Sequence, residues 1–468
     1  MHRPLMALAA FVALCAPAAA QSLTPEEQQK IDAAVTSSLA TYGVPAASVA
    51  VVRGGRIVMA KAYGKASETL PVASPAMPFQ IASNSKQFTA AALLLLEDEG
   101  KLSLDDKVAK YLPGISGGDQ ISIRQLLSHT SGLQDYWPHD YSFAAMARPV
   151  TPQGIVDIWA KKPLDYVPGT KWQYSNTGYV VAGMIAEKVS GMPLLSFLQK
   201  RVFKPLGMTS VMDQDLAIGA RYPQGYGRAA LGPVRPAVPA ARGWLYAAGE
   251  LSMTAEDLAK WDIARMNRTL LPADDWAAQE TSVKLTDGTD THYGLGVFNA
   301  DRDGRHAITH TGEAVGFLSV NNVYPDDKAA IVVLTNSWSG RAYGAIARQI
   351  AGIVLPAKAT PVAMSGEAAM TARTRALYDA LRRGALDRRQ VTDNLAYYFT
   401  PQVRADFQSS LAPLGDPTGF EVQGEPELRG GFEIRSYKVT YPTRALSISV
   451  FTEPGANGRF EQFLVNPA

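Results

Sequence analysis

The sequence predicts an α+β (α/β) fold, in which an antiparallel sheet is flanked by helices and interrupted by a helical insertion. Strand patterns occur early, at 48–63, and late, at 293–334, whereas the stretch between them is mostly helical. Strands from both ends of one domain can pair in a single sheet, which leaves a cleft beside the insertion. A small α+β domain is expected to follow at 367–468.

Residues 1–20 have the pattern of a secretory signal peptide. Arg3 supplies the positive charge, and the apolar stretch 5–15 is too short to span a bilayer. Small residues at 18–20 then offer a cleavage site before Gln21. We therefore expect the protein to be secreted or periplasmic.

Composition and charge disfavour several classes of protein. The formal net charge is +2 without a basic cluster, so nucleic acid is not an expected partner. The only cysteine, Cys15, lies within the signal peptide, and Leu14 before it is not the small residue that a lipoprotein needs. The mature chain would have no disulfide. No later apolar run predicts a transmembrane segment. The oligomeric state is not determined by the sequence.

The first elements have clear boundaries. The capping box Thr-Pro-Glu-Glu at 24–27 begins a helix that Gly43 ends. Two strands follow, at 48–52 and 57–63, joined by a hairpin turn at 53–56.

The middle of the chain, 102–206, is predicted to be mostly helical. A capping box at Ser122 leads into 126–133, where His129 is interpreted as the end of a helix. An apolar helix is expected over 180–189. Residues 213–245 have no periodicity, and loops of that length are usually functional or mobile.

Four strands and a helix complete the domain that we expect over 21–355. The strands are predicted at 293–298, 306–309, 317–324 and 330–334, with the helix at 342–355.

Residues 356–366 have the composition of a linker. The unit at 367–468 contains helical patterns followed by strands, and it has no histidine and no cluster of titratable residues. A structural or docking role is the simpler interpretation of this unit, and a lid or substrate-binding role is the alternative.

The stretch 83–86, Ser-Asn-Ser-Lys, is the first candidate motif. Residues three apart share a helix face, so the Lys86 amine can reach the Ser83 hydroxyl. In an apolar wall, desolvation lowers the pKa of a lysine and lets its amine take the serine proton. A helix N-terminus also supplies backbone N–H groups for an oxyanion. Alone, the pattern also fits a helix cap followed by a surface lysine.

Two further motifs follow, Tyr-Ser-Asn at 174–176 and His-Thr-Gly at 310–312. Each alone also fits a structural role: a core aromatic and a helix cap at 174–176, or a strand-end histidine at 310–312. Together with 83–86 they supply what acyl transfer by a serine needs, namely a base, an acid for the leaving group and an oxyanion site.

The predicted catalytic residues are Ser83, Lys86 and Tyr174. Lys86 or Tyr174 takes the Ser83 proton, and Tyr174 returns it to the leaving group. Asn176 holds either the substrate amide or the Lys86 side chain.

The substrate-binding candidates on the late strand are His310, Thr311 and Gly312. Gly312 would let the strand edge approach the substrate closely. The backbone N–H groups of Ser83 and Glu313 would face the oxyanion.

In this order, the motifs resemble those of the serine β-lactamase and penicillin-binding protein superfamily. The closest branch holds class C β-lactamases, D-alanyl-D-alanine carboxypeptidases, D-aminopeptidases and related esterases. The resemblance covers 25–355 and includes the flanking stretches 126–133, 247–249 and 293–296. It implies a sheet-plus-helical-domain fold, an acyl-enzyme on Ser83, no cofactor or metal, and a small peptide, ester or β-lactam as substrate.

One departure bears on the substrate. Class C β-lactamases have lysine where this chain has His310. Lysine is a permanent cation suited to a substrate carboxylate, whereas histidine is charged only below a pKa near ~6.5. We therefore expect His310 to be neutral at pH 7.5. This departure from the lysine also favours a peptidase or an esterase over a β-lactamase. The alternatives are a class C-type β-lactamase and a non-catalytic penicillin-recognising protein that acylates without turnover.

Two rival sites are disfavoured. Ser116 lies in a G-x-S-x-G pattern, but Pro113 and a charged stretch precede it where a nucleophile elbow needs an apolar strand. His306 and His310 have the spacing H-x-x-x-H, but they lie on a predicted strand, where residues four apart are too distant to share a metal ion, so zinc is not expected.

Overall fold

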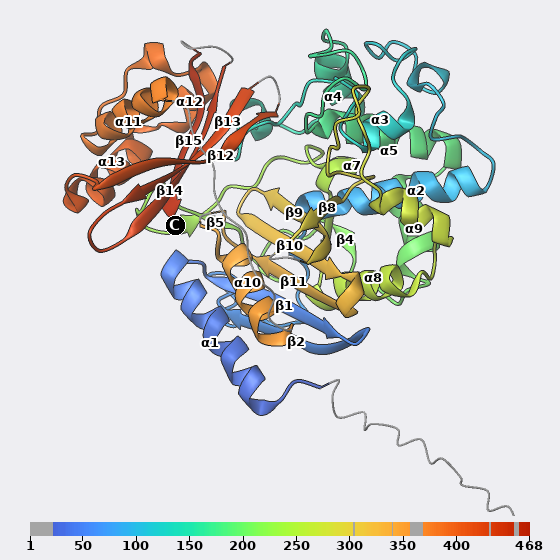
Figure 1. The fold of residues 1–468 in the computed structure, drawn as a ribbon, viewed down its shortest axis with the longest axis horizontal. Coiled ribbons are helices and arrows are strands. Elements are labelled where there is room, and N and C mark those ends of the chain that lie inside the picture. Colours follow the sequence, from blue (N-terminus) through green and yellow to red (C-terminus); the bar gives the residue numbers. More distant parts are fainter. Residues whose placement is uncertain (1–21, 303–304, 339, 356–367, 430–431, 454–457) are drawn as a thin grey trace, which may run out of the picture.

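The computed structural model describes most of the chain after the predicted signal peptide (Figure 1). The described residues are 22–302, 305–338, 340–355, 368–429, 432–453 and 458–468. The predicted signal peptide and linker lie outside them.

A six-stranded antiparallel sheet forms the centre of the main domain, in the order β2-β1-β11-β10-β9-β8. Its strands are β1 (Ala46–Arg53), β2 (Arg56–Gly64), β8 (Phe298–Asp301), β9 (His306–Ala314), β10 (Phe317–Tyr324) and β11 (Ala329–Thr335). The prediction of one sheet built from both ends of the domain, with helices inserted between them, is confirmed.

The strand predicted at 293–298 is wrong in its position. Strand β8 begins only at Phe298, and Tyr293 forms an isolated bridge with that residue. Gly296 has φ 83° and His292 has φ 53°, so the backbone turns where the apolar pattern suggested an extended strand.

Both faces of the sheet are covered. Helices α1 (Pro25–Tyr42) and α10 (Ala342–Val354) pack together on one face, where Val49 and Val51 of β1 point. Ala50 and Val52 alternate with them and join the larger core on the other face. Because both faces are buried, the run from Val49 to Val52 is apolar without a break. The capping box predicted for α1 is present.

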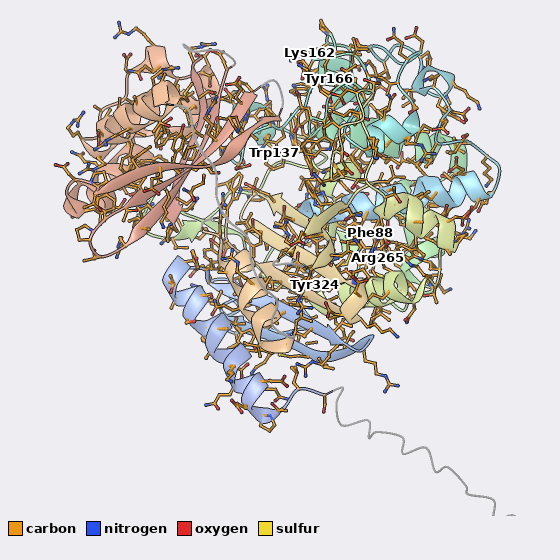
Figure 2. The ribbon with its side chains drawn as sticks, in the orientation of Figure 1. Phe88, Trp137, Lys162, Tyr166, Arg265 and Tyr324 are labelled. Atoms are coloured by element: carbon orange, nitrogen blue, oxygen red, sulfur yellow. The ribbon has the colours of Figure 1, made fainter. Side chains whose placement is uncertain are left out.

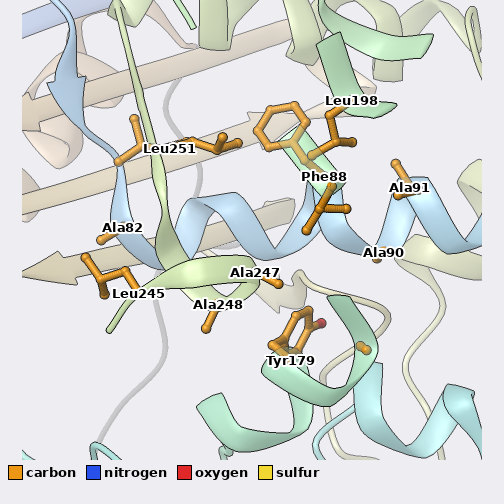
Figure 3. Close-up of a cluster of buried hydrophobic side chains, with 14 of the residues drawn as sticks. Ala82, Phe88, Ala90, Ala91, Tyr179, Leu198, Leu245, Ala247, Ala248 and Leu251 are labelled. Carbon is orange, nitrogen blue, oxygen red and sulfur yellow. The ribbon is translucent and has the colours of Figure 1, made fainter. Parts of the chain in front are cut away.

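The helical layer surrounds α2 (Lys86–Asp98), whose first eleven residues are all buried. Figure 3 shows Phe88 pointing from α2 toward Leu198, while Tyr179 lies on the opposite side of the helix. The other helices are α3 (Ile123–Leu127), α4 (Pro152–Ile155), α5 (Asn176–Ser190), α6 (Leu194–Leu198), α7 (Tyr246–Gly249), α8 (Ala255–Asn267) and α9 (Ala273–Glu280).

Five short strands complete this part: β3 (Phe79–Gln80), β4 (Met212–Asp213), β5 (Tyr226–Gly227), β6 (Arg235–Pro236) and β7 (Leu251–Met253). Among the described residues, no single helix is long and apolar enough to cross a membrane. Helix α5 and the bent continuation Leu194–Phe203 pass that test together, by length and composition only.

The C-terminal unit has its own antiparallel sheet, in the order β12-β13-β14-β15. Its strands are β12 (Gly419–Arg429), β13 (Phe432–Thr440), β14 (Ala445–Thr452) and β15 (Phe460–Pro467), and its helices are α11 (Ala368–Arg382), α12 (Asp393–Tyr398) and α13 (Pro401–Leu411). Its hydrophobic core also includes Tyr141, Ala229 and Ala230 of the main domain. The two parts therefore share a buried interface.

Candidate active site

Ser83 lies in a tight turn, the 3₁₀ segment Ala82–Ser85, directly before α2. Ala82 has φ 48°, a left-handed conformation that costs a non-glycine residue about 1–2 kcal/mol. Contacts with β10 hold the turn: Asn84 Nδ2 donates to Ser319 Oγ at 2.8 Å, and Ser319 Oγ donates to the Ile81 carbonyl at 2.8 Å. The strained turn places Ser83 in the wall of a cavity.

The Lys86 amine lies behind Ser83 and is fully buried. Its Nζ is 3.1 Å from Ser83 Oγ, 2.8 Å from Asn176 Oδ1 and 2.7 Å from the Ala248 carbonyl oxygen. Figure 3 shows Ala248 on α7, which lies beside α2. A neutral amine has two N–H bonds for Asn176 and Ala248 and a lone pair for the Ser83 proton. This arrangement suits a general base.

Asn176 is the first residue of α5. Ser175 is the N-cap, because its side chain accepts a hydrogen bond from the Gly178 N–H at 3.2 Å. The alternative that Asn176 is an ordinary helix cap is therefore wrong. Its Nδ2 donates to Asp135 Oδ1 at 3.1 Å and to the Trp137 carbonyl at 3.3 Å, which leaves Oδ1 for the lysine.

Tyr174 lies between the lysine and a buried histidine. Lys86 Nζ is 4.8 Å from the centre of the Tyr174 ring, and the His129 ring lies against that ring at a tilt of 34°, with the two ring centres 4.2 Å apart. His129 Nδ1 also accepts the Ser175 N–H at 3.1 Å, so one imidazole orients the stretch that carries Tyr174.

Sequence reasoning missed the contributions of His129 and Asp135. His129 does follow α3, as predicted, but its side chain turns inward to support 174–176. The stretch 126–133 was part of the family resemblance, and that was the available signal for His129. Nothing in the local pattern around Asp135 indicated its bond to Asn176.

His310 is buried and neutral. Its Nδ1 lies 2.5 Å from the Thr311 carbonyl oxygen, which requires a proton on Nδ1, so Nε2 accepts from the Tyr293 hydroxyl at 3.0 Å. Burial, and then the positive charge of Lys86, lower the pKa of His310 to about 3. The expected neutrality at pH 7.5 is supported. The expectation that charge returns near pH 6.5 is wrong, because that value ignored burial.

Gly312 has a different role from the predicted one. A Cβ at this position would lie 2.0 Å from the Ile81 carbonyl oxygen and 2.3 Å from Ser319 Oγ. Gly312 does not line the cavity, whereas Thr311 and Glu313 do. The glycine therefore lets β9 pack against the turn that carries the serine, rather than against a substrate.

The cavity in front of Ser83 has a volume of about 240 Å³. Much of its wall is aromatic or apolar, from Trp137, Trp172, Tyr174, Leu245, Phe298 and Ile434. The carboxylates of Asp140 and Glu313 also line it, while no lysine or arginine among the described residues does. Glu313 Oε1 accepts from Trp338 Nε1, and Asp140 Oδ2 accepts from Gln462 Nε2 at 2.8 Å.

The structure brings most of the predicted site residues to this cavity. Ser83, Tyr174, Asn176, His310, Thr311 and Glu313 line it, with Lys86 directly behind Ser83. Their catalytic and oxyanion roles stay predictions. Ser116 lies elsewhere, in a turn where its N–H donates to the Ala160 carbonyl at 2.9 Å. Within the described ranges, no group of three or more His, Cys, Asp or Glu side chains could hold a metal ion.

The profile of the beta-lactamase family matches residues 31–355. The chain belongs to the beta-lactamase family. Among its relatives, the putative penicillin-binding protein PbpX of Bacillus subtilis (strain 168) is 28% identical over 64% of this chain and 73% of its own. Penicillin-binding protein 4* of the same strain is 30% identical over 62% of this chain and 67% of its own.

Solved structures agree with this assignment. A D-stereospecific amidohydrolase from Streptomyces sp. is 28% identical, with a TM-score of 0.58 over 70% of this chain and 98% of its own. A penicillin-binding protein homologue from Pyrococcus abyssi shares the fold at 22% identity, with a TM-score of 0.61. That likeness covers 92% of this chain and 91% of the other.

Proposed function

We propose that this beta-lactamase family protein is a serine hydrolase that cleaves amide or ester bonds through an acyl-enzyme on Ser83. The observation that supports this most is the contact of Lys86 Nζ with Ser83 Oγ, together with the two acceptors that hold the amine in place. A buried amine with this geometry can take the serine proton as the oxygen attacks.

In the proposed reaction, Ser83 Oγ forms a bond to the substrate carbonyl carbon while its proton passes to Lys86 Nζ. The bond to the leaving amine or alcohol then breaks as that group receives a proton through the Lys86 and Tyr174 pair. Water attacks the resulting ester, which releases the acid and returns the proton to Ser83. The backbone N–H groups of Ser83 and Glu313 are the proposed donors to the oxyanion.

We further propose that the preferred substrate has a neutral or amine-bearing group near the scissile bond, rather than a carboxylate. Both ring nitrogens of His310 are engaged by protein atoms, so the imidazole has no N–H to offer a carboxylate. The Asp140 and Glu313 carboxylates on the wall would attract an ammonium group. The likeness to a D-stereospecific amidohydrolase favours D-amino-acid amides within this class.

A fluorophosphonate probe and four substrates test this proposal. We expect the probe to label Ser83, and D-amino-acid p-nitroanilides and neutral p-nitrophenyl esters to be hydrolysed faster than nitrocefin or a D-Ala-D-Ala peptide. Labelling without turnover of any substrate would instead identify a non-catalytic binder. Efficient nitrocefin hydrolysis would favour the β-lactamase alternative.

We also propose that the protein is exported, with cleavage before Gln21. The support is the charge and apolar pattern of residues 1–20. N-terminal sequencing of the protein recovered from periplasm or medium should begin at Gln21. A protein retained in the cytoplasm with an intact N-terminus would contradict this.

A further inference from the structure

Strand β15 of the C-terminal unit contacts three successive residues of the main domain. His139 Nδ1 lies 2.9 Å from Glu461 Oε1, and both side chains are buried, with 5% and 1% exposed. The Asp140 N–H donates to Gln462 Oε1, and Gln462 Nε2 donates back to Asp140 Oδ2. The Tyr141 hydroxyl donates to the Glu461 carbonyl oxygen. This two-sided pairing fixes the backbone of the main-domain loop.

The same loop supports the catalytic lysine. Its residues Asp135 and Trp137 accept hydrogen bonds from Asn176 Nδ2, and Asn176 Oδ1 accepts from Lys86 Nζ. Trp137 also lines the cavity. Figure 2 places Trp137 between the C-terminal sheet and the helical layer. A continuous series of contacts therefore runs from β15 to the amine beside Ser83.

The C-terminal unit also reaches the cavity directly. Ile434 of β13 is half-buried and lines the cavity together with Ser83, Trp137 and His139. An apolar side chain at this position limits how far an acyl or leaving group can extend.

Other contacts hold the unit in place. Arg235 forms an ion pair with the buried Asp406 of α13, and the Gly340 N–H donates to Asn466 Oδ1 at 3.0 Å. The buried Tyr141 belongs to the core of the C-terminal unit. These contacts attach the C-terminal unit to the main domain, so Ile434 is held in a fixed position in the wall of the cavity.

We propose that the C-terminal unit is part of the active site, with Ile434 as a specificity-determining residue and Glu461 and Gln462 as positioning residues. Ile434 selects substrates by size, and the β15 contacts hold the loop of residues 135–141 against Asn176. This inference rests on the proposed function for the size selection, whereas the positioning is testable without turnover. Bond-making itself stays with the main domain, because Ser83, Lys86 and Asn176 all belong to it.

Size selection is tested in the full-length protein with Ile434→Ala and Ile434→Trp. The measurement is kcat/KM for p-nitrophenyl acetate and p-nitrophenyl octanoate, with labelling rates for fluorophosphonates carrying short and long alkyl chains. We expect Ile434→Ala to raise the long-to-short ratio about 5- to 10-fold, mainly through KM, and Ile434→Trp to lower it. Ile353→Ala, a truncation of another half-buried isoleucine on α10, should leave the ratio unchanged. Unchanged ratios in both Ile434 variants would overturn the size-selecting role.

Positioning is tested by backbone hydrogen exchange over residues 135–141. Glu461→Ala should speed exchange there and lower kcat for short and long substrates alike, and Glu461→Gln should restore most of both because the amide keeps a polar group in the buried contact with His139. Glu453→Ala removes a more exposed carboxylate of the same unit, paired with Arg459, and should change neither. Exchange and kcat that do not respond to Glu461→Ala would overturn the positioning role.

The two failures are distinguishable. A wild-type protein that no fluorophosphonate labels would refute Ser83 as the nucleophile and size selection with it, while the exchange measurement still decides the positioning role. A labelled wild type whose Ile434 variants keep the same ratios would refute size selection alone.

Discussion

The two sides of the cavity are built in different ways. On the Ser83 side, the nucleophile and its base are three positions apart in one turn and helix. On the opposite side, the wall joins residues such as Asp140 and Gln462, which are 322 positions apart. The first side depends on local geometry and a buried helix, and the second depends on the docking of the C-terminal unit on a loop of the main domain. Local patterns therefore predicted the candidate nucleophile and its candidate base, whereas the proposed selectivity depends on contacts that no short motif contains.

This comparison makes a testable distinction. Changes on the Ser83 side should reduce turnover of every substrate, while changes on the far side should alter the choice among substrates.

Ser83→Ala should abolish probe labelling and lower kcat by several orders of magnitude for every substrate, because it removes the attacking oxygen. Active-site labelling and steady-state kinetics measure this. Ser116→Ala is the matched control and should behave like wild type. Labelling that persists in Ser83→Ala would show that Ser83 is not the nucleophile.

Lys86→Ala should lower kcat by about 10²- to 10⁴-fold, the usual contribution of a general base. Adding Tyr174→Phe should cost little more, because Lys86 Nζ lies over the Tyr174 ring and the two are predicted to move one proton as a unit. The measurement is a double-mutant cycle in kcat. Losses that multiply in the double variant would show that the two residues act independently.

Asp135→Ala should lower kcat by about 10- to 100-fold for all substrates, because the buried Asn176 amide loses an acceptor. Asp135 lies between the two sides of the site, so this variant shows whether the loop supports the base. Asp135→Asn keeps an acceptor and should recover part of the loss. Asp287→Ala, an exposed control that bonds only within its own turn, should have no effect. Equal activity of Asp135→Ala and wild type would show that the loop does not support Lys86 through Asn176.

His310→Lys should raise kcat/KM for carboxylate-bearing β-lactams by about 10-fold, or ~1–2 kcal/mol, and should change neutral esters much less. In the wild type, the pKa of His310 is lowered to about 3, so the imidazole gains no charge as pH falls from 8 to 5. The ratio of kcat/KM for an anionic substrate to that for a neutral one should therefore stay flat over this range.

The pH profiles of both proteins on one anionic and one neutral substrate check this expectation. A wild-type ratio that rises toward pH 5 would show that His310 titrates in the accessible range. Such a rise would support His310 as a cation that binds the substrate carboxylate.

Several features could be predicted because their causes are local. The capping box at 24–27 begins α1, and the apolar run 49–52 forms the strand β1, which is covered on both faces. The spacing of Ser83 and Lys86 brings hydroxyl and amine together on one helical turn. The prediction of a strand at 293–298 was wrong because Gly296, with φ 83°, interrupts the apolar run.

The sequence by itself determined the fold class, the candidate nucleophile and the candidate base, because helix periodicity and capping act over a few residues. Only the tertiary structure decided what surrounds them. The neutrality of His310 depends on burial and on Lys86, which is distant in the chain. The contribution of Ile434 depends on where the C-terminal sheet docks. Burial and docking are properties of the packed chain, and residues far apart in sequence set them jointly.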